Sequence, residues 1–506
     1  MKSDKYQQAV TAFLDKDNAE KKQKRSVANR IVDLLLDLDI ELFLDIEQSE
    51  PYISFPHEPF VAHPIGGTVF RNKLSAIYWE TAKNGISESV HKQVVATLSG
   101  KAHSEKITYK LWNRVAQHEN EIYYDIADNL NVVKITGLGW SIEQTAPVKF
   151  RRYPHQAIQV VPVKQGNLRA FLKYLNIRNP DEQLLALTYF PVACIPDIPR
   201  CAIACIGEQG TAKTGGLRKI QELIDPTTGD LLHPPQKPGD LFALAAGYYC
   251  LYLDNVSHVT SDESDAFCRI VTGGTNGQRK LYTDNDIVQA SHKRLLGFTS
   301  INQIIQKQDL LERSILLHFE YIPDESRKPE EQINQEFLAE KPLIMGGLFD
   351  ALSFAIGNKV TSTSGLPRMA DYAQYAASAA KYLGESEDGF LGLLSATFDK
   401  QKQTGLQSSV LGQVILDFMA NKSEYSGRIT EVRQELVEYA ERSKGITQYD
   451  LPSHLKLTQK INELIPALRQ KGIGVTTFEK GSGSHIRLFW TDGQPKMAVV
   501  AEEVFK

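Results

Sequence analysis

The pattern of hydrophobic positions divides the chain into stretches of different period. Residues 31–103 carry amphipathic helical patterns, interrupted by a proline-containing loop around residues 51–64. From residue 106 the period shortens toward two, with Asn, Asp and Gly between the runs, which predicts short strands up to about residue 152. Helical and wholly apolar runs then alternate to about residue 322. This alternation is typical of a parallel sheet with helices on both faces.

The last hundred residues form a pattern of their own. Three helical stretches precede two strand-like runs separated by the turn sequence GSGS, and helices followed by a hairpin predict a winged helix. Residues 453–490 contain more basic than acidic side chains, and a local positive excess suits phosphate contact. Lys456, Lys460 and Arg487 are therefore candidates for DNA binding. Winged helices also serve as protein interaction modules, and the sequence leaves that alternative open.

The strongest chemical signal is a glycine-containing turn between an apolar run at residues 202–206 and a helical pattern. The sequence GEQGTAKT follows the phosphate-binding motif G-x-x-x-x-G-K-[ST], except that Ala212 replaces the second glycine. Backbone N–H groups and the helix N-terminus of such a turn bind phosphate oxygens. Lys213 is expected to reach the β- and γ-phosphates of ATP, and Thr214 to ligate Mg²⁺. An ordinary strand–turn–helix with a chance lysine is the alternative.

The predicted nucleotide-binding residues are the continuous turn and the first residues of its helix. They are Gly207, Glu208, Gln209, Gly210, Thr211, Ala212, Lys213, Thr214 and Gly215.

Another apolar run ends at Asp254. A carboxylate at the end of a buried parallel strand near a phosphate-binding turn can hold Mg²⁺, although an aspartate that caps a turn is also common. Many P-loop ATPase motors have a glutamate directly after this aspartate, where it activates water, whereas this chain has Asn255. An amide can orient water but cannot act as a general base. Either another residue supplies the base or hydrolysis is slow.

Further segments follow in an order that suits an ATP-driven motor. A predicted hairpin contains the basic residues Arg279 and Lys280. The next apolar run, which we expect to lie between the strand before the glycine-containing turn and the strand that ends at Asp254, ends near Thr299, where a hydroxyl can sense the γ-phosphate. A short helix then ends at Arg313, which can stabilise transition-state charge in a neighbouring subunit's site. A surface salt bridge is the alternative for this arginine.

The ordered set GEQGTAKT, CLYLDN, RKLYTDND, GFTS and DLLERSILL resembles the AAA+ ATPases of the superfamily 3 helicase kind. More narrowly, it is similar to replicative ATPase-helicases encoded by phages, plasmids and integrated elements, from roughly residue 106 to the end. The resemblance implies rings, usually hexamers, with ATP sites between subunits. It also implies a hairpin near Arg279 and Lys280 that grips single-stranded DNA. This sequence departs from the motifs of these proteins at Ala212, Asn255 and Thr299. At the position of Thr299 these proteins often have asparagine.

Two amphipathic patterns beyond the core, at residues 342–357 and 366–384, predict a helical lid. Arg368 begins the second and is a candidate nucleotide sensor, with a helix-surface arginine as an equal alternative. The predicted fold is thus an α/β P-loop AAA+ core with a parallel sheet, between a mixed α+β N-terminal region and a C-terminal winged helix. The predicted domains are a mostly helical region (1–105), a small β-rich module (106–165), the ATPase core (166–340), the lid (341–405) and the winged helix (406–506).

Composition limits the class of protein and the compartment in which we expect it. The 506 residues are 42% hydrophobic and 23% charged, as in globular proteins, and the net charge of −4 gives no global attraction to nucleic acid. The basic run at residues 21–25 suits a solvated helix or a nucleic-acid tail. The five cysteines have neither zinc-ribbon nor redox spacing, which favours buried thiols in a reducing compartment. With no apolar run long enough to cross a bilayer, we expect a cytoplasmic protein.

These features predict an ATP- and Mg²⁺-dependent, ring-forming DNA helicase that acts on single-stranded or forked DNA during replication of a mobile element. A primase or another replication protein is a further candidate partner. The alternative, favoured by Asn255, is an ATP-binding loader or regulatory module that recruits replication partners without unwinding. A defence ATPase or a primase is disfavoured because the N-terminal part has no nuclease, protease or acidic constellation.

Overall fold

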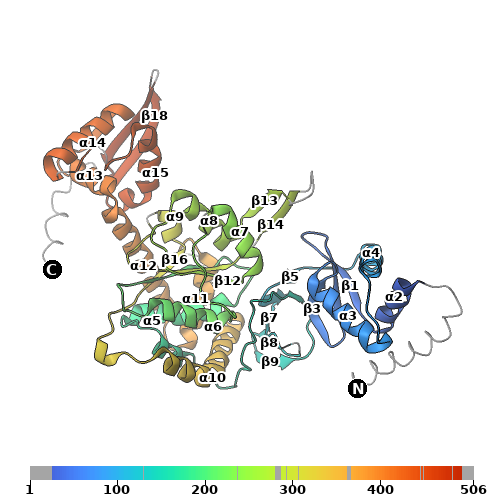
Figure 1. Cartoon of the computed structure of the whole chain (residues 1–506). Helices are drawn as coiled ribbons and strands as arrows, with labels where there is room; N and C mark the ends of the chain where they lie inside the picture. Colours follow the sequence, from blue (N-terminus) through green and yellow to red (C-terminus); the bar gives the residue numbers. More distant parts are fainter. Residues whose placement is uncertain are drawn as a thin grey trace.

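The computed structural model describes residues 26–128, 130–235, 237–279, 287–291, 293–305, 307–361, 366–444, 446–447, 450–480 and 483–492. Within these residues the chain forms an N-terminal α+β region, a core built on a parallel sheet, and a C-terminal unit (Figure 1). The long helix α12 (Glu387–Ser408) leads from the core to the C-terminal unit. The basic run at residues 21–25 and the tail after residue 492 lie outside the described residues.

The N-terminal region differs from the mostly helical one predicted for residues 1–105. Helices α2 (Val27–Asp37), α3 (Thr68–Ala82) and α4 (Glu88–Glu105) pack on a meander of β1 (Glu41–Asp45), β2 (Pro51–Phe55) and β3 (Glu58–Pro64). The loop predicted at residues 51–64 is therefore two strands. Pro51 is tolerated because it is the first residue of its strand. Most of β3 is buried, so it lacks the alternation that marks a half-buried strand.

The strands predicted after residue 106 are present, but they do not form a separate module. β4 (Thr108–Tyr109), β5 (Leu111–Trp112) and β10 (Lys149–Arg151) join the N-terminal sheet in the order β4-β1-β2-β3-β10-β5. β6 (Val115–His118), β7 (Glu121–Asp125), β8 (Val132–Thr136) and β9 (Gly139–Glu143) form an antiparallel meander packed on the core. The boundary at residue 105 has no structural counterpart, because pairing between distant segments decides it and local periodicity does not report such pairing.

A parallel sheet in the order β12-β15-β11-β16 forms the centre of the core. Its strands are β11 (Ala202–Ile206), β12 (Cys250–Leu253), β15 (Leu295–Ser300) and β16 (Ser314–His318). The strand that ends at Thr299 and Ser300 lies between the other two motif strands, as the sequence predicts. Leu232 forms an isolated parallel bridge with Leu253 of the edge strand β12. This bridge widens the sheet beyond β12.

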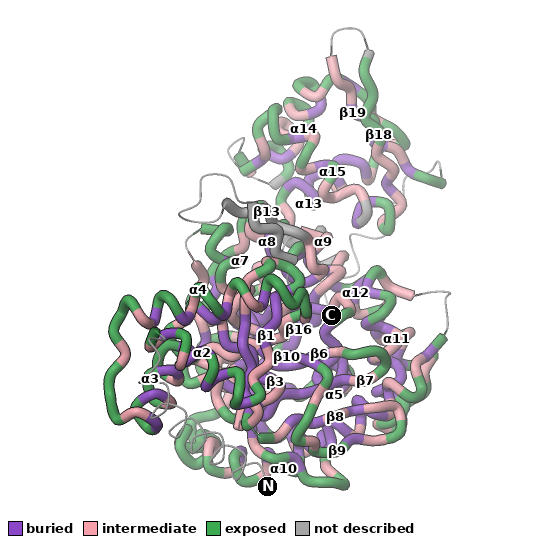
Figure 2. The backbone as a smooth tube through the Cα atoms, turned by 90° about the vertical axis from the view of Figure 1, so that its right-hand side faces the viewer, coloured by how far each residue is buried: buried purple, intermediate pink, exposed green. Residues whose placement is uncertain are grey.

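Helices cover this sheet, and the strands between them are buried (Figure 2). They are the 3-10 helix η1 (Leu168–Tyr174), α5 (Pro180–Ala193), α6 (Lys213–Ile224), α7 (Pro238–Gly247), α8 (Ser261–Thr272) and α9 (Gln308–Leu311).

The two helices predicted as a lid pack on the core, and the first of them begins earlier than predicted. α10 (Glu330–Gly357) starts before residue 341 and contains Pro342 in its interior. The carbonyl of Pro342 accepts a hydrogen bond from the Val163 N–H at 3.0 Å. A Cβ on Gly346 would lie 1.7 Å from the Val163 carbonyl oxygen, so glycine permits this close approach. α11 (Ala370–Tyr382) packs on α5 and α10. Both predicted lid helices, α10 and α11, are therefore part of the core.

The C-terminal unit has a hydrophobic interior of its own. It consists of α13 (Val410–Met419), β17 (Glu424–Arg428), α14 (Ile429–Lys444), α15 (His454–Gln470), β18 (Ile473–Lys480) and β19 (Gly483–Trp490). The three predicted helices and the hairpin are confirmed. The sequence did not predict β17, a mostly exposed strand without an apolar pattern, which pairs with β19 in a sheet of order β17-β19-β18.

All five cysteines are free and buried, as predicted. Among the described residues, no helix is both long enough and apolar enough to span a bilayer.

Candidate functional site

The turn between β11 and α6 has the shape that its glycines impose. Gly210 has a φ of +82°, a conformation that glycine adopts at little cost. A Cβ on Gly207 would lie 2.6 Å from the carbonyl oxygen of Phe319, so only glycine fits there. α6 begins at Lys213, and its unpaired N–H groups and positive dipole end face the turn. The turn therefore has the local geometry of an anion-binding site.

Ala212 is the residue where the sequence departs from the motif. It is the N-cap of α6 and has the left-handed angles φ 61° and ψ 24°. A residue with a Cβ pays about 1–2 kcal/mol for this conformation. The turn is therefore formed with alanine, at a cost that glycine would avoid.

Replacing Ala212 with glycine is expected to raise the free energy of unfolding by about 0.5–1 kcal/mol, because relief of left-handed strain outweighs the added entropy of the unfolded chain. Urea denaturation measures the change. Gly215→Ala on the same helix is the matched substitution, since its Cβ would meet nothing within 4 Å. It should stabilise by about the same amount through helix propensity. A loss of stability in Ala212→Gly would contradict the strain argument.

Asp254 is the centre of a hydrogen-bonded cluster at the carboxyl ends of the strands. Its Oδ1 accepts from Thr214 Oγ1 at 2.9 Å and from Thr299 Oγ1 at 2.5 Å. The Asn255 N–H in turn donates to Thr299 Oγ1 at 2.8 Å. Three residues predicted from separate motifs thus meet at one carboxylate. Hard cations such as Mg²⁺ prefer oxygen ligands, so the side chains of Thr214 and Asp254 fit that ion.

Thr299 has a different position from that of an exposed phosphate sensor. Its side chain is 1% exposed, and its hydroxyl connects Asp254 with the Asn255 backbone. It therefore positions the carboxylate. Asn255 is exposed, with a φ of 59° that asparagine tolerates better than most residues.

Lys213 lies over the turn. Its Nζ donates to the Glu208 carbonyl at 3.0 Å, and the Thr211 hydroxyl donates to the same oxygen at 2.9 Å. The ammonium is thus held beside the turn by one backbone oxygen. A bound phosphate would offer it a charged acceptor in place of a neutral one.

The structure places Arg313 and Arg368 together, away from this turn. Arg313 precedes β16, at the end of the sheet opposite Gly207. Its Nη1 contacts Asp309 Oδ1 at 2.6 Å, and Arg368 Nη1 contacts the same oxygen at 2.5 Å. Burial raises the pKa of Asp309, but the hydrogen bond from Arg313 brings it below its ordinary value. A nucleotide sensor that acts in its own subunit would have to lie at the turn. Arg368 does not reach the turn of its own chain.

The predicted hairpin is confirmed as β13 (Thr275–Arg279) paired with β14 (Ile287–Ser291). Arg279 ends its first strand, and Lys280 lies outside the described residues. Figure 1 shows the hairpin projecting from the core beside α7 and α8.

The DNA-binding candidates of the C-terminal unit differ in their contacts. Arg487 forms a two-pronged ion pair with Glu424 at 2.8 and 2.7 Å. Lys460 contacts Glu463 at 2.7 Å, whereas Lys456 is exposed on the first turn of α15.

A cavity of about 820 Å³ opens beside the turn between β11 and α6. Gly210 and Thr214 line one side, and Asn176, Tyr321 and Arg327 line others. No local sequence pattern indicates the last three residues, which belong to connecting segments. A nucleotide whose phosphates occupy the turn would extend into this space.

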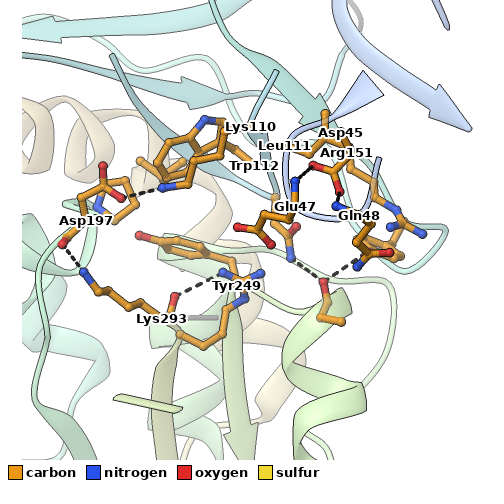
Figure 3. Close-up of a pocket in the computed structure, with 16 residues that line it drawn as sticks. Asp45, Glu47, Gln48, Lys110, Leu111, Trp112, Arg151, Asp197, Tyr249 and Lys293 are labelled. Atoms are coloured by element: carbon orange, nitrogen blue, oxygen red, sulfur yellow. Dashed lines mark hydrogen bonds and ion pairs between the residues drawn. The ribbon is translucent and has the colours of Figure 1, made fainter. Parts of the chain in front are cut away.

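A second cavity, of about 250 Å³, lies between the N-terminal region and the core (Figure 3). Lys110 Nζ contacts Asp197 Oδ1 at 2.9 Å, and Lys293 Nζ donates to the Asp197 carbonyl at 2.5 Å. Burial and the nearby Asp45 raise the pKa of Glu47 on the opposite wall. Cations and carboxylates from both regions thus face one another, which suits a joint between them.

Two protein-family models match parts of the chain. A family model described as actinomycete integrative conjugative element replication protein matches residues 168–387, which include the turn, Asp254, Arg313 and Arg368. The model of the C-terminal domain of the same RepA proteins matches residues 411–494. No curated protein sequence matches the chain.

Solved structures give a weaker likeness. SCCmec type IV Cch, described as an active helicase, has a TM-score of 0.46 and 12% identity over 90% of this chain and 93% of its own. The apo C-terminal region of NrS-1 has a TM-score of 0.41 and 13% identity over 91% of this chain and 98% of its own.

The two family models together span the core and the C-terminal unit. Residues 168–387 and 411–494 are therefore similar to the replication proteins (RepA) of actinomycete integrative conjugative elements.

Proposed function

We propose that this protein is an ATP-dependent, ring-forming DNA helicase that opens forked DNA during replication of an integrative conjugative element. The observation that carries the proposal is the cluster of Thr214, Asp254 and Thr299 next to Lys213, at the carboxyl edge of a parallel sheet. The strand order β12-β15-β11-β16 is that expected of an AAA+ core, in which the single bridge at Leu232 takes the place of an outer strand beside β12.

Each residue of the cluster has a role in the proposed reaction. The turn and Lys213 bind the phosphates of ATP, and Thr214 and Asp254 hold Mg²⁺, which neutralises phosphate charge when bound. Thr299 keeps the Asp254 carboxylate directed at the ion site. Asn255 is exposed next to it and can orient a water molecule, but it cannot remove a proton.

The location of Arg313 supports a site shared between subunits. It lies at the opposite end of the sheet from its own phosphate-binding turn, so it can stabilise charge only in the site of a neighbour. Asp309 holds it together with Arg368, so both arginines would approach the neighbouring nucleotide. A closed ring, which we propose to be a hexamer, would give every site such a partner.

Mixing two inactive variants tests this sharing. Lys213→Ala should lack nucleotide binding but keep Arg313, and Arg313→Ala should have the reverse defect. In a random equal mixture about one quarter of the sites would combine an intact turn with an intact arginine, so ATPase activity should return to about that fraction of wild type. If Arg313→Ala alone hydrolyses ATP at the wild-type rate in assembled rings, the shared-site assignment is wrong.

The hairpin and the C-terminal unit are the proposed DNA contacts. The order of α13, β17, α14, α15 and the β18–β19 hairpin is that of a winged helix, whose third helix typically enters a groove of DNA. Lys456 is exposed at the start of that helix.

Strand displacement on a labelled DNA fork tests the function as a whole. The wild-type protein should release the labelled strand with ATP but not with ADP, from a fork with either a 5′ or a 3′ tail. Binding of ATP and DNA without displacement from either fork would instead favour a loader or regulatory module. Asn255, in the place of a general base, is the observation that keeps this second function in view.

A further inference from the structure

We propose that the segment after β16, residues 319–327, is a nucleotide-binding arm of the same subunit, in which Arg327 binds phosphate and Tyr321 packs against the base. The inference rests on the proposed ATP site and adds two residues from a connecting segment to it.

The root of the arm is fixed to the phosphate-binding turn. The Phe319 N–H donates to the Ile206 carbonyl at 2.7 Å, which continues the pairing of β16 with β11 up to the turn. The Glu320 N–H donates to the Asn176 carbonyl at 3.0 Å. On the far side, Glu330 at the start of α10 contacts Arg218 of α6 at 2.5 Å. Both ends of the arm are thus held by elements that carry or flank the turn.

Two side chains of the arm lie directly against the turn. A Cβ on Gly210 would lie 3.1 Å from Arg327 Nη2 and 3.7 Å from Tyr321 Cε2. Both residues line the cavity of about 820 Å³ that continues from the turn. A guanidinium at that position is within reach of an anion bound by the turn. Its planar set of donors suits phosphate oxygens.

Tyr321 provides an apolar surface in the same cavity. Tyr321 is 47% exposed. Leu175, Ile322 and Pro323 line the space around it. An aromatic ring with apolar neighbours suits the flat face of a nucleobase. The cavity thus combines a phosphate-binding turn with a surface for a base.

An exposed ion pair holds Arg327 in the absence of nucleotide. Arg327 Nη1 contacts Asp324 Oδ1 at 2.9 Å, and the two side chains are 49% and 76% exposed. Such pairs contribute little to stability. A bound phosphate would therefore compete with Asp324 for the guanidinium at small cost. Asp324 and Arg327 should then have opposite effects on nucleotide affinity.

Titration of the full chain with the fluorescent nucleotide mant-ATP tests the arm. Arg327→Ala should raise the Kd about 10-fold or more, because a charged hydrogen bond to phosphate is lost. Asp324→Asn should lower the Kd about 2-fold, since the competitor for Arg327 is removed. Lys328→Ala is the matched control, because Lys328 lies on the same rim but contacts Glu336 at 3.3 Å. It should change the Kd less than about 2-fold.

Competition by inorganic tripolyphosphate separates the two side chains. This ligand has no base, so Tyr321→Ala should leave its inhibition constant unchanged while weakening mant-ATP binding. Arg327→Ala should weaken both.

Several outcomes would overturn the inference. Equal losses in Arg327→Ala and Lys328→Ala would indicate general electrostatics, and equal losses in Arg327→Ala and Asp324→Asn would indicate a structural ion pair. If the wild type binds mant-ATP, Lys213→Ala does not and Arg327→Ala binds normally, only the arm is refuted. If the wild type does not bind mant-ATP, the proposed function fails together with it.

Discussion

Lys213→Ala is expected to raise the Kd for ATP about 100-fold, and to reduce ATPase activity and strand displacement to background. In the free protein the ammonium donates to a backbone oxygen of the turn, that of Glu208 at 3.0 Å. With ATP bound, the same group would contact phosphate oxygens with full charge complementarity. The interaction is therefore much stronger in the bound state, and its loss falls on nucleotide binding.

The same substitution should leave the fold intact. Lys213 is the first residue of α6, and alanine has the highest helix propensity. The midpoint of thermal unfolding without nucleotide should stay within about 2 °C of wild type, while stabilisation by added ATP should disappear. Lys359→Ala is a suitable control, since this lysine contacts Asp371 on α11 and does not line the cavity. A Lys213→Ala variant with full ATPase activity would refute the assignment of the turn.

Much of the core could be predicted because its signals are local. The apolar runs that end at Gly207, Asp254 and Thr299 are buried strands, and such strands are recognisable from a few consecutive residues. The capping residues of α8, Thr260 and Gly273, likewise have the types that begin and end helices. The placement of β15 between β11 and β12 followed from the motif order.

The remainder depends on pairing between distant segments. Tyr321 and Arg327 lie at Gly210 only because β16 is a neighbour of β11, and no local pattern in the connecting segment reports this. Arg368 begins a predicted helix near the core, but an ion pair with Asp309 directs it to the opposite end of the sheet from the turn. The burial of Thr299 is equally invisible in the sequence, because a hydroxyl at a strand end suits either position.

The joint between the β6–β9 meander and the core also depends on one distant pair. Arg114, just before β6, is fully buried, and its Nε contacts Asp225 Oδ1 at 2.9 Å. Its other nitrogens donate to the carbonyls of Asp125 and Ala157 at 3.0 Å, and of Pro226 at 3.2 Å. Asp225 ends α6, the helix that begins at Lys213. One guanidinium thus connects the meander to the far end of α6, the helix that begins at the turn after β11.

Arg114→Met is therefore expected to lower the free energy of unfolding by about 3–5 kcal/mol, because it leaves Asp225 buried without its charged partner. Urea denaturation followed by circular dichroism measures the loss. The exposed pair of Arg71 and Glu88 provides the control, and Arg71→Ala should cost less than about 1 kcal/mol. Adding Asp225→Leu to Arg114→Met should restore part of the lost stability, since the unpaired carboxylate at residue 225 is then removed. If Arg114→Met proves no more destabilising than Arg71→Ala, the buried pair does not hold the meander on the core.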